Sequence, residues 1–368
     1  MNVALVAGGT GGHLFPAEAL AHALGEGVAI TLITDARAKP FLKSFPAAAV
    51  RFVTTTTLTR KTPLAAARMV ATNAVAMARA MLILRRAKAD IVVGFGGYPT
   101  VAPLMAAKVL RCPVVIHEAN AVMGRANRFL AKGAHVATSF PDVKGLPAGT
   151  RSVSQTGMPV RPAVRQAAKP FVPPGERLNL LVFGGSQGAR VFADLVPPAF
   201  EALPANVRAR IDLTQQVREE DVSRVRAAYD ALGVSAGLAP FFKDLPERMA
   251  AAHLVIGRSG ASTVAELAVI GRPSLLVPLP GALDQDQAHN AAALEALGGA
   301  RRLDQAALDG PALAAEIAAL FRAPEKLAAM AEAARGLSRK NAAADLAHLV
   351  KVRGGAIGWS EDVDGVHG

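Results

Sequence analysis

Short, wholly apolar runs alternate with longer amphipathic segments along most of this chain. Residues 2–7 form the first apolar run, a glycine-rich turn follows, and residues 16–24 have the spacing of a helix. The same alternation predicts further strands at 28–34, 91–94 and 114–117 and helices at 64–88 and 99–110. Apolar strands that alternate with helices indicate a parallel sheet covered on both faces.

The pattern starts again after a proline-rich passage that ends near residue 174. It predicts strands at 178–183, 208–213, 254–257 and 275–278 and helices at 219–232, 311–336 and 339–352. We therefore expect an α/β protein with two Rossmann-like, doubly wound domains facing a cleft, 1–160 and 165–337. A helix at about 339–353 is expected to pack back on the first domain, and residues 354–368 are expected to form a mobile tail.

The composition is that of a well-packed globular protein, because 51% of the 368 residues are hydrophobic. The single cysteine, Cys112, cannot form an internal disulfide, and the N-terminus lacks the features of a signal peptide. We therefore expect a reducing, cytoplasmic setting. The best candidate for a membrane span, residues 91–107, is interrupted by glycine and proline, so no span of ~20 apolar residues is expected.

The net charge of +12 favours an anionic partner, either nucleic acid or lipid. Residues 51–88 contain several basic residues and no acidic one. Aromatic residues make up only 5% of the chain and are not interleaved with the basic ones, so we expect no nucleic-acid binding. The alternative to a lipid partner is a basic face that meets only water.

The predicted helix at 64–88 carries most of this basic segment. One of its faces mixes basic and apolar side chains, as helices at anionic membrane surfaces do, and we predict that this face contacts the membrane: Arg68, Val75, Arg79, Leu82 and Arg86. The roughly opposite face is expected to join the core through Val70, Met77, Met81 and Leu84. An ordinary amphipathic helix is the simpler alternative.

The first glycine turn, at residues 8–13, follows a strand and opens a helix, where backbone N–H groups can bind an anion. The glycines of this turn would let the backbone approach a ligand, and the helix dipole would keep His13 neutral as a candidate general base. A purely structural turn, and a histidine that only bonds backbone, are the alternatives.

Acidic residues after two other predicted strands compete with this assignment. Asp35 could imitate the ribose-binding acid of a dehydrogenase, although the glycine turn does not match the dinucleotide fingerprint. Glu118 lies where open α/β sheets place ligands and is the alternative general base, with Asn120 two residues further on.

The second half of the chain carries two further turns of this kind. Gly184–Ala189 lacks the Lys-Ser/Thr of a P-loop, so a magnesium-bound triphosphate is not expected. Gly257–Thr263 opens a helix in which Glu266 suits the two hydroxyls of a ribose, and residues 284–290 add amides and carboxylates. No His/Cys/Asp cluster has metal-ligand spacing, so Arg161 would stabilise a leaving diphosphate in place of a metal.

Six motifs, in order, resemble those of the MurG family: GGTGGHLFP (8–16), GFGGYP (94–99), HExN (117–120), GxPxR (157–161), GGSQGA (184–189) and RSGAxTxxE (258–266). The resemblance implies a GT-B glycosyltransferase that inverts configuration and needs no cofactor or essential metal. Its expected reaction transfers GlcNAc from UDP-GlcNAc to the C4 hydroxyl of MurNAc in undecaprenyl-pyrophosphoryl-MurNAc-pentapeptide (lipid I), giving lipid II for peptidoglycan synthesis.

The resemblance also implies roles for individual residues. Phe242 would present backbone to the uracil, Glu266 would bind the ribose, and Gln287 the GlcNAc hydroxyls. The diphosphate would meet Ser186 and the helix start Ser259, Gly260, Ala261, Ser262, Thr263 and Val264. Thr10, Gly11, Gly12, His13, Asn120 and Arg161 would close the site from the first domain. Two departures from the family pattern are Ala119, where Gln is usual, and Met123, where Pro is usual.

The partners implied are UDP-GlcNAc, lipid I, anionic inner-leaflet lipids, and other cell-wall synthesis and division proteins. The expected location is peripheral, on the cytoplasmic face of the bacterial inner membrane. Three other functions stay open at this point: a different GT-B enzyme such as a glycolipid transferase or UDP-GlcNAc epimerase, a nicotinamide dehydrogenase, and a membrane-attached binder that does not catalyse.

Overall fold

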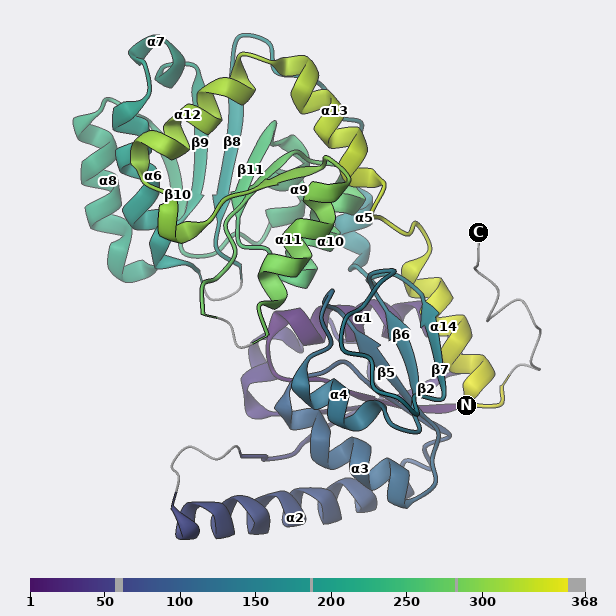
Figure 1. Cartoon of the computed structure of the whole chain (residues 1–368). Coiled ribbons are helices and arrows are strands. Elements are labelled where there is room, and N and C mark those ends of the chain that lie inside the picture. Colours follow the sequence, from purple (N-terminus) through teal and green to yellow (C-terminus); the bar gives the residue numbers. More distant parts are fainter. Residues whose placement is uncertain (57–61, 186–187, 282–283, 357–368) are drawn as a thin grey trace. The chain divides into compact units, whose positions relative to one another are not determined.

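The computed structural model describes residues 1–56, 62–185, 188–281 and 284–356, and the chain divides into two compact units. Unit 1 is Met1–Arg161 together with the chain from Arg339 onward, and unit 2 is Pro162–Ser338. Each unit has a central sheet between helices (Figure 1). Most of the predicted tail, residues 357–368, lies outside the described residues.

Unit 1 is built on a seven-stranded parallel sheet. Val6 pairs with Ile33 on one side and with Gly94 on the other, so these three neighbouring strands end level with one another. The strands are mostly apolar because helices cover both faces of the sheet. In spatial order the strands are β3 (Ala49–Phe52), β2 (Ala29–Thr34), β1 (Asn2–Val6), β4 (Ile91–Gly94), β5 (Val114–Glu118), β6 (His135–Thr138) and β7 (Ser152–Gln155).

The helical elements of unit 1 are α1 (Gly11–Leu24), η1 (Ala36–Phe41), α2 (Pro63–Arg86), η2 (Tyr98–Thr100), α3 (Val101–Val109), α4 (Arg125–Ala131) and α14 (Ala342–Arg353). Although α14 comes from the far end of the described chain, it packs against α1 (Figure 1). Leu346, Leu349 and Val350 of α14 are fully buried in the same apolar core as Leu20. Each such side chain stabilises the fold by roughly 1.5–3 kcal/mol, so α14 is an integral part of unit 1.

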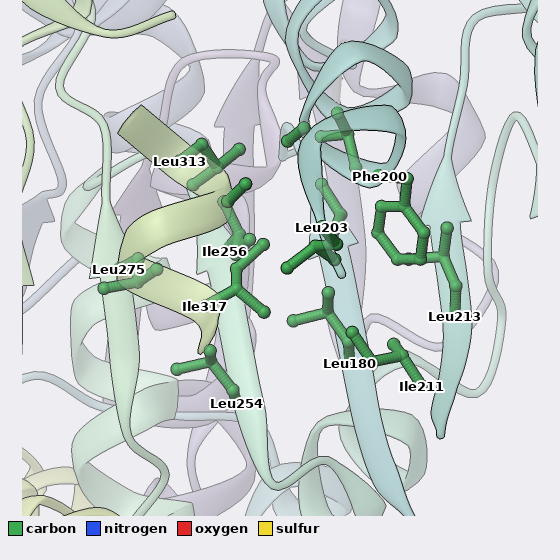
Figure 2. Packing of buried hydrophobic residues seen from close by; sticks show 14 of the residues in the cluster. Leu180, Phe200, Leu203, Ile211, Leu213, Leu254, Ile256, Leu275, Leu313 and Ile317 are labelled. Atoms are coloured by element: carbon green, nitrogen blue, oxygen red, sulfur yellow. The ribbon is translucent and has the colours of Figure 1, made fainter. Parts of the chain in front are cut away.

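Unit 2 has a six-stranded parallel sheet with the spatial order β10 (Ala236–Ala239), β9 (Ile211–Gln216), β8 (Leu178–Phe183), β11 (Leu254–Gly257), β12 (Ser274–Leu276) and β13 (Ala300–Arg302). Its helical elements are α5 (Pro162–Ala167), α6 (Arg190–Ala202), α7 (Ala205–Arg208), η3 (Glu219–Asp221), α8 (Val222–Ala231), α9 (Leu245–Ala251), α10 (Ala261–Ile270), α11 (Asp286–Ala296), η4 (Gln305–Ala307), α12 (Gly310–Phe321) and α13 (Pro324–Arg335). Figure 2 shows the core between sheet and helices, where Ile256 of β11 lies near Leu313 and Ile317 of α12.

The two sheets are wound in the same way, which confirms the doubly wound fold predicted from the sequence. The chain passes from β1 through β2 to β3 and then returns to β4 on the other side of β1. In unit 2 it passes from β8 to β10 and returns to β11 beside β8. The carboxyl ends of β1 and β4, and of β8 and β11, are therefore topological switch points, where open α/β sheets bind ligands.

Three predicted helices differ from the observed ones. The first begins at Gly11 and not at residue 16, because Pro16 is accommodated inside α1. The missing N–H of Pro16 leaves the Gly12 carbonyl without its helical donor, and Gly12 is exposed to water. The single helix predicted at 311–336 is two helices, because Ala323 precedes Pro324 and adopts φ −129°, ψ 68°.

The buried face of α2 also differs from the prediction. Val70, expected in the core, is 63% exposed. The fully buried side chains are Ala76, Ala80 and Leu84, which are spaced four residues apart and therefore lie on one line along the helix. Small side chains on this line let α2 lie close against α3.

Candidate functional site

The imidazole of His13 packs against the backbone of two glycine turns, one after β1 and one after β4. A Cβ added at Gly8 would lie 3.1 Å from Nδ1 of His13, and one added at Gly97 would lie 3.1 Å from Cε1. Thr10 Oγ1 lies 3.0 Å from the same Nδ1. A side chain at either position would crowd the ring, and Gly97 also has a φ of 80°, which favours glycine.

His13 is neutral at pH 7 in this environment. The pKa of His13 is lowered to about 4, first by burial and then by the positive charge of Arg37, while the negative charge of Asp35 partly opposes the shift. The ring is mostly covered but keeps some contact with solvent. The sequence predicted a neutral ring from the helix dipole, whereas the structure gives burial as the main cause.

The start of α1 is suited to bind an anion. The N–H groups of Gly11 and Gly12 belong to the first helical turn, so neither has an acceptor within the helix. Gly12 is exposed, and no atom lies within 4 Å of the position that its Cβ would occupy. Thr10 and His13 beside it are partly exposed, whereas Gly11 is buried, and the ligand site that the sequence predicts at these four residues stays a prediction.

Asp35 supports this turn from the end of β2. Its carboxylate accepts the Gly9 N–H at 2.9 Å and binds the Arg37 guanidinium through both oxygens at 2.9 Å. These bonds to Arg37 hold the pKa of Asp35 below its usual value. A Cβ at Gly9 would lie only 2.4 Å from Asp35 Oδ1. The carboxylate of Asp35 stabilises the loop through these bonds. Its environment therefore differs from that of an exposed acid that binds the ribose in a dehydrogenase.

Glu118 is the centre of a buried hydrogen-bond network after β5. Its side chain is 1% exposed, and Oε1 accepts the backbone N–H of Asn120 at 2.9 Å. Oε2 accepts the Gly124 N–H at 3.1 Å and Asn127 Nδ2 at 2.8 Å. Burial raises the pKa of Glu118, while these donors oppose the rise. With its oxygens occupied by donors from its own loop, Glu118 has the geometry of a residue that shapes the loop.

Asn127 was not singled out from the sequence, because an asparagine inside a short helix carries no signal of its role. The structure shows its amide donating to Glu118 and to the carbonyl of His117. The loop therefore keeps a defined shape although Ala119 and Met123 replace the usual family residues, and Asn120 is held at its edge by Glu118.

Arg161 lies over the ring of Phe15. The distance from the guanidinium carbon to the ring centroid is 4.0 Å, which is within the range of a cation–π interaction. Phe15 belongs to α1, two residues after His13. Within unit 1, the Arg161 side chain thus packs against α1, the helix that begins at the glycine turn.

In unit 2 the turn after β8 is held by Gln216, which the sequence did not indicate. Gln216 Oε1 accepts the Gly184 N–H at 3.0 Å, and Nε2 donates to the carbonyls of Gly185 and Pro240 at 3.1 Å. One side chain thus joins the carboxyl ends of β8, β9 and β10. Ser186, predicted to bind the diphosphate, lies outside the described residues.

The start of α10 has the features predicted for the donor diphosphate and ribose. Gly260 is the N-cap, so the N–H groups of Ala261, Ser262 and Thr263 have no acceptor within the helix. The Ser262 hydroxyl is buried and has no hydrogen-bond partner in the described part of the chain. Glu266, on the second turn, is 7% exposed, and Val264 between them is fully buried.

The segment after β12 is fastened to this helix start by a set of polar side chains. Arg258 donates to the carbonyls of Val277 and Pro278 at 3.0 Å. Ser259 Oγ donates to the carbonyl of Gln287 at 2.8 Å, and the amide oxygen of Gln287 accepts the Leu279 N–H at 3.1 Å. Gln287, predicted to bind sugar, therefore also fixes the turn before α11.

Phe242 is 9% exposed and follows β10, and Arg248 lies over its ring at 4.5 Å. The neighbouring Phe241 is 59% exposed. Phe242 follows the carboxyl end of β10, and the contact of its backbone with uracil, which the family resemblance implies, stays a prediction.

No three His, Cys, Asp or Glu side chains gather as a possible metal site among the residues that the structure describes. Guanidinium groups lie near the switch points, among them Arg37 and Arg161 in unit 1 and Arg258 in unit 2. Together with the helix N-termini, these groups are candidates for anion recognition.

All five residues predicted to face a membrane are exposed on α2: Arg68, Val75, Arg79, Leu82 and Arg86. Val75 is 53% and Leu82 48% exposed. Within the described residues, α2 is the one helix whose length and composition would allow it to cross a membrane, with 17% of its most apolar window buried. The sequence argument had placed the best candidate at 91–107, which is a strand followed by a short helix.

Comparison with known proteins agrees with this fold and these motifs. The models of the glycosyltransferase family 28 N-terminal and C-terminal domains match residues 3–138 and 179–350. A relative from Methylobacterium sp. (strain 4-46) is 55% identical over 356 residues, 95% of each chain. One from Rhodopseudomonas palustris (strain HaA2) is 53% identical over 95% of this chain and 97% of the relative. Both are named UDP-N-acetylglucosamine–N-acetylmuramyl-(pentapeptide) pyrophosphoryl-undecaprenol N-acetylglucosamine transferase.

Among solved structures, the crystal structure of Acinetobacter baumannii MurG matches with a TM-score of 0.76 and 28% identity, over 95% of this chain and 99% of that one. The S. aureus MnaA–UDP co-structure shares the fold, with a TM-score of 0.68, 13% identity and 98% coverage of each chain. The two doubly wound units, with a glycine turn at each switch point, define a glycosyltransferase of the GT-B fold. The chain belongs to glycosyltransferase family 28, and the resemblance to the MurG family is confirmed.

The Glu118 network generates a prediction that separates a loop-shaping role from a base. Glu118→Gln would turn an amide toward donors of the loop, and we expect the free energy of unfolding to fall by about 1–3 kcal/mol. Denaturant unfolding measures this, with Glu26→Gln, an exposed glutamate on the same unit, as the matched control. Unchanged stability together with lost turnover would instead make Glu118 the base.

Proposed function

We propose that this protein transfers GlcNAc from UDP-GlcNAc to the C4 hydroxyl of MurNAc in lipid I, with inversion at C1. The observation that carries the proposal is that the family motifs, at both switch points, coincide with helix starts whose N–H groups have no helical acceptor. The named relatives cover 95% of the chain at 52–55% identity and support the same substrates.

The donor is held by unit 2 in this proposal. The start of α10, with the unpartnered Ser262 hydroxyl, binds the diphosphate, and Glu266 accepts hydrogen bonds from the ribose. The backbone at Phe242 receives the uracil, and Gln287 binds the GlcNAc hydroxyls. Arg161 stabilises the charge that develops on the departing UDP, so no metal is required.

His13 is the proposed general base. If the proton on Nδ1 is donated to Thr10 Oγ1, Nε2 is left to accept the proton of the attacking hydroxyl. The C4 oxygen then forms a bond to C1 as the bond between C1 and the UDP oxygen breaks. A pKa of about 4 makes His13 a weak base in the free protein, and a bound diphosphate would raise the pKa by its negative charge.

The direct test is the release of UDP from UDP-GlcNAc with a lipid I analogue. We expect UDP and a disaccharide product only when both substrates are present. Conversion of UDP-GlcNAc alone would indicate an epimerase, and binding of UDP-GlcNAc without UDP release would indicate a binder. Stabilisation against heat by NAD and not by UDP would indicate a dehydrogenase.

The base assignment predicts the effect of His13→Gln. We expect kcat to fall by about 10²–10⁴-fold, because a general base contributes about this much, while KM for UDP-GlcNAc changes little. The exposed His22 lies on the same helix, and His22→Gln is the control. A near-normal kcat with an unchanged pH profile would remove His13 from this role.

We further propose that unit 1 binds the cytoplasmic face of the membrane peripherally, through the exposed face of α2. Arg79 lies in the middle of α2, and a charge there opposes insertion across the bilayer core. Ala76, Ala80 and Leu84 are buried against the protein, so the helix lies in the plane of the surface. The arginines would then pair with anionic headgroups while Val75 and Leu82 insert. Association with other cell-wall synthesis and division proteins stays a prediction.

The membrane proposal predicts that Arg68/Arg79/Arg86→Glu abolishes most binding to anionic vesicles, since each basic residue contributes about 1 kcal/mol near such a surface. Co-sedimentation with vesicles containing phosphatidylglycerol measures the effect. Arg165/Arg226/Lys326→Glu makes the same change of charge at exposed positions of unit 2 and should bind as the unaltered protein does. Equal binding by both variants would contradict a role for α2.

A further inference from the structure

Both the backbone and the side chain of Arg161 are restrained. Its backbone lies between Pro159 and Pro162, and a residue that precedes proline is restricted to extended conformations. Met158 and Val160 are each only 9% exposed, so the segment is anchored in unit 1 on both sides of Pro159. The side chain then reaches the Phe15 ring at 4.0 Å.

The ring of Phe15 is itself fixed from two sides. Phe41, at the end of η1, meets it edge to face, with centroids 5.7 Å apart and an interplanar angle of 85°. On the other side the ring covers Gly11, where an added Cβ would lie 2.8 Å from Cε2. Phe15 therefore has a defined position relative to the first turn of α1.

These contacts join the cation to the anion-binding end of α1 through one aromatic ring. When a guanidinium stacks with its face on a ring, its in-plane N–H donors point past the edge of the ring, where they can meet an anion. Because a planar guanidinium recognises phosphate oxygens by direction, its orientation matters as well as its charge.

We propose that Phe15 is a positioning residue, which orients Arg161 for the diphosphate of the nucleotide-sugar donor. This inference rests on the proposed function, because it takes the diphosphate as the ligand of Arg161. Phe15 itself does not touch the substrate. Its role is to restrict the orientations of the guanidinium before the diphosphate binds, so that less side-chain entropy is lost on binding.

The test is a double-mutant cycle read out by the Kd for UDP and for uridine. We expect Phe15→Leu to weaken UDP binding by about three- to tenfold, the range of a partly desolvated cation–π pair, and to leave uridine binding unchanged. In the Arg161→Gln background, Phe15→Leu should have no further effect on UDP. Phe15→Tyr keeps the aromatic face and should bind UDP as the unaltered protein does.

Phe321→Leu is the matched control, because it removes the cation–π contact of Arg210 at 4.7 Å in unit 2, next to the amino end of β9. It should leave Kd for UDP unchanged. Phe15→Met, which fills a similar volume without a ring, replaces Phe15→Leu if the latter does not fold.

Two results would overturn the inference: normal UDP binding by Phe15→Leu or Phe15→Met, or an equal loss of UDP binding with and without Arg161. The second result would mean that the ring acts through the shape of α1. Failure of the proposed function is seen separately, because the unaltered protein would then release no UDP from UDP-GlcNAc in the presence of the lipid I analogue, whatever its Kd for UDP.

Discussion

The close approach of backbone at the ends of parallel strands is the constraint on which the rest of unit 1 depends. The His13 ring lies against Gly8 and Gly97, which come from turns after β1 and β4. A methyl group at either position would stand 3.1 Å from the ring, which is closer than ordinary van der Waals contact. Because β1 and β4 are adjacent in the sheet and end level with each other, the fold itself brings the turns that follow them together. The neutral imidazole is a consequence of this packing, since burial lowers its pKa.

The loops at these strand ends are shaped by single buried polar side chains, each of which satisfies several backbone groups. Asp35 does this for the turn after β1, Glu118 for the loop after β5, and Gln216 for the turn after β8. Leaving such groups unpaired would cost about 1–3 kcal/mol each, so the bonds fix loop shape as well as stability. The sites are therefore supported by residues that need not touch a substrate.

Positively charged side chains occur in two different structural settings in this protein. Exposed arginines on α2 provide a surface of one sign, which acts through long-range attraction and is weakened by salt. Arg161 and Arg258 are held by defined contacts, with Phe15 and with the carbonyls after β12. A cation held in this way can recognise a phosphate through the fixed directions of its N–H donors. For this reason the net charge alone says little about the reaction.

The sequence by itself determined the two doubly wound sheets, the glycine turns and the family, because apolar strands and glycine spacing are local signals. It also made His13 and Arg161 candidates for the site, since both lie inside motifs. It did not reveal the hydrogen bonds of Asn127 and Gln216 or the packing of Arg161 on Phe15. These contacts join residues that are far apart in the chain. The core face of α2 was misjudged at Val70 because periodicity shows that a helix has two faces but not which small residues meet α3. Only the tertiary structure decided these points, since hydrogen bonding and close packing are set by which side chains folding brings together.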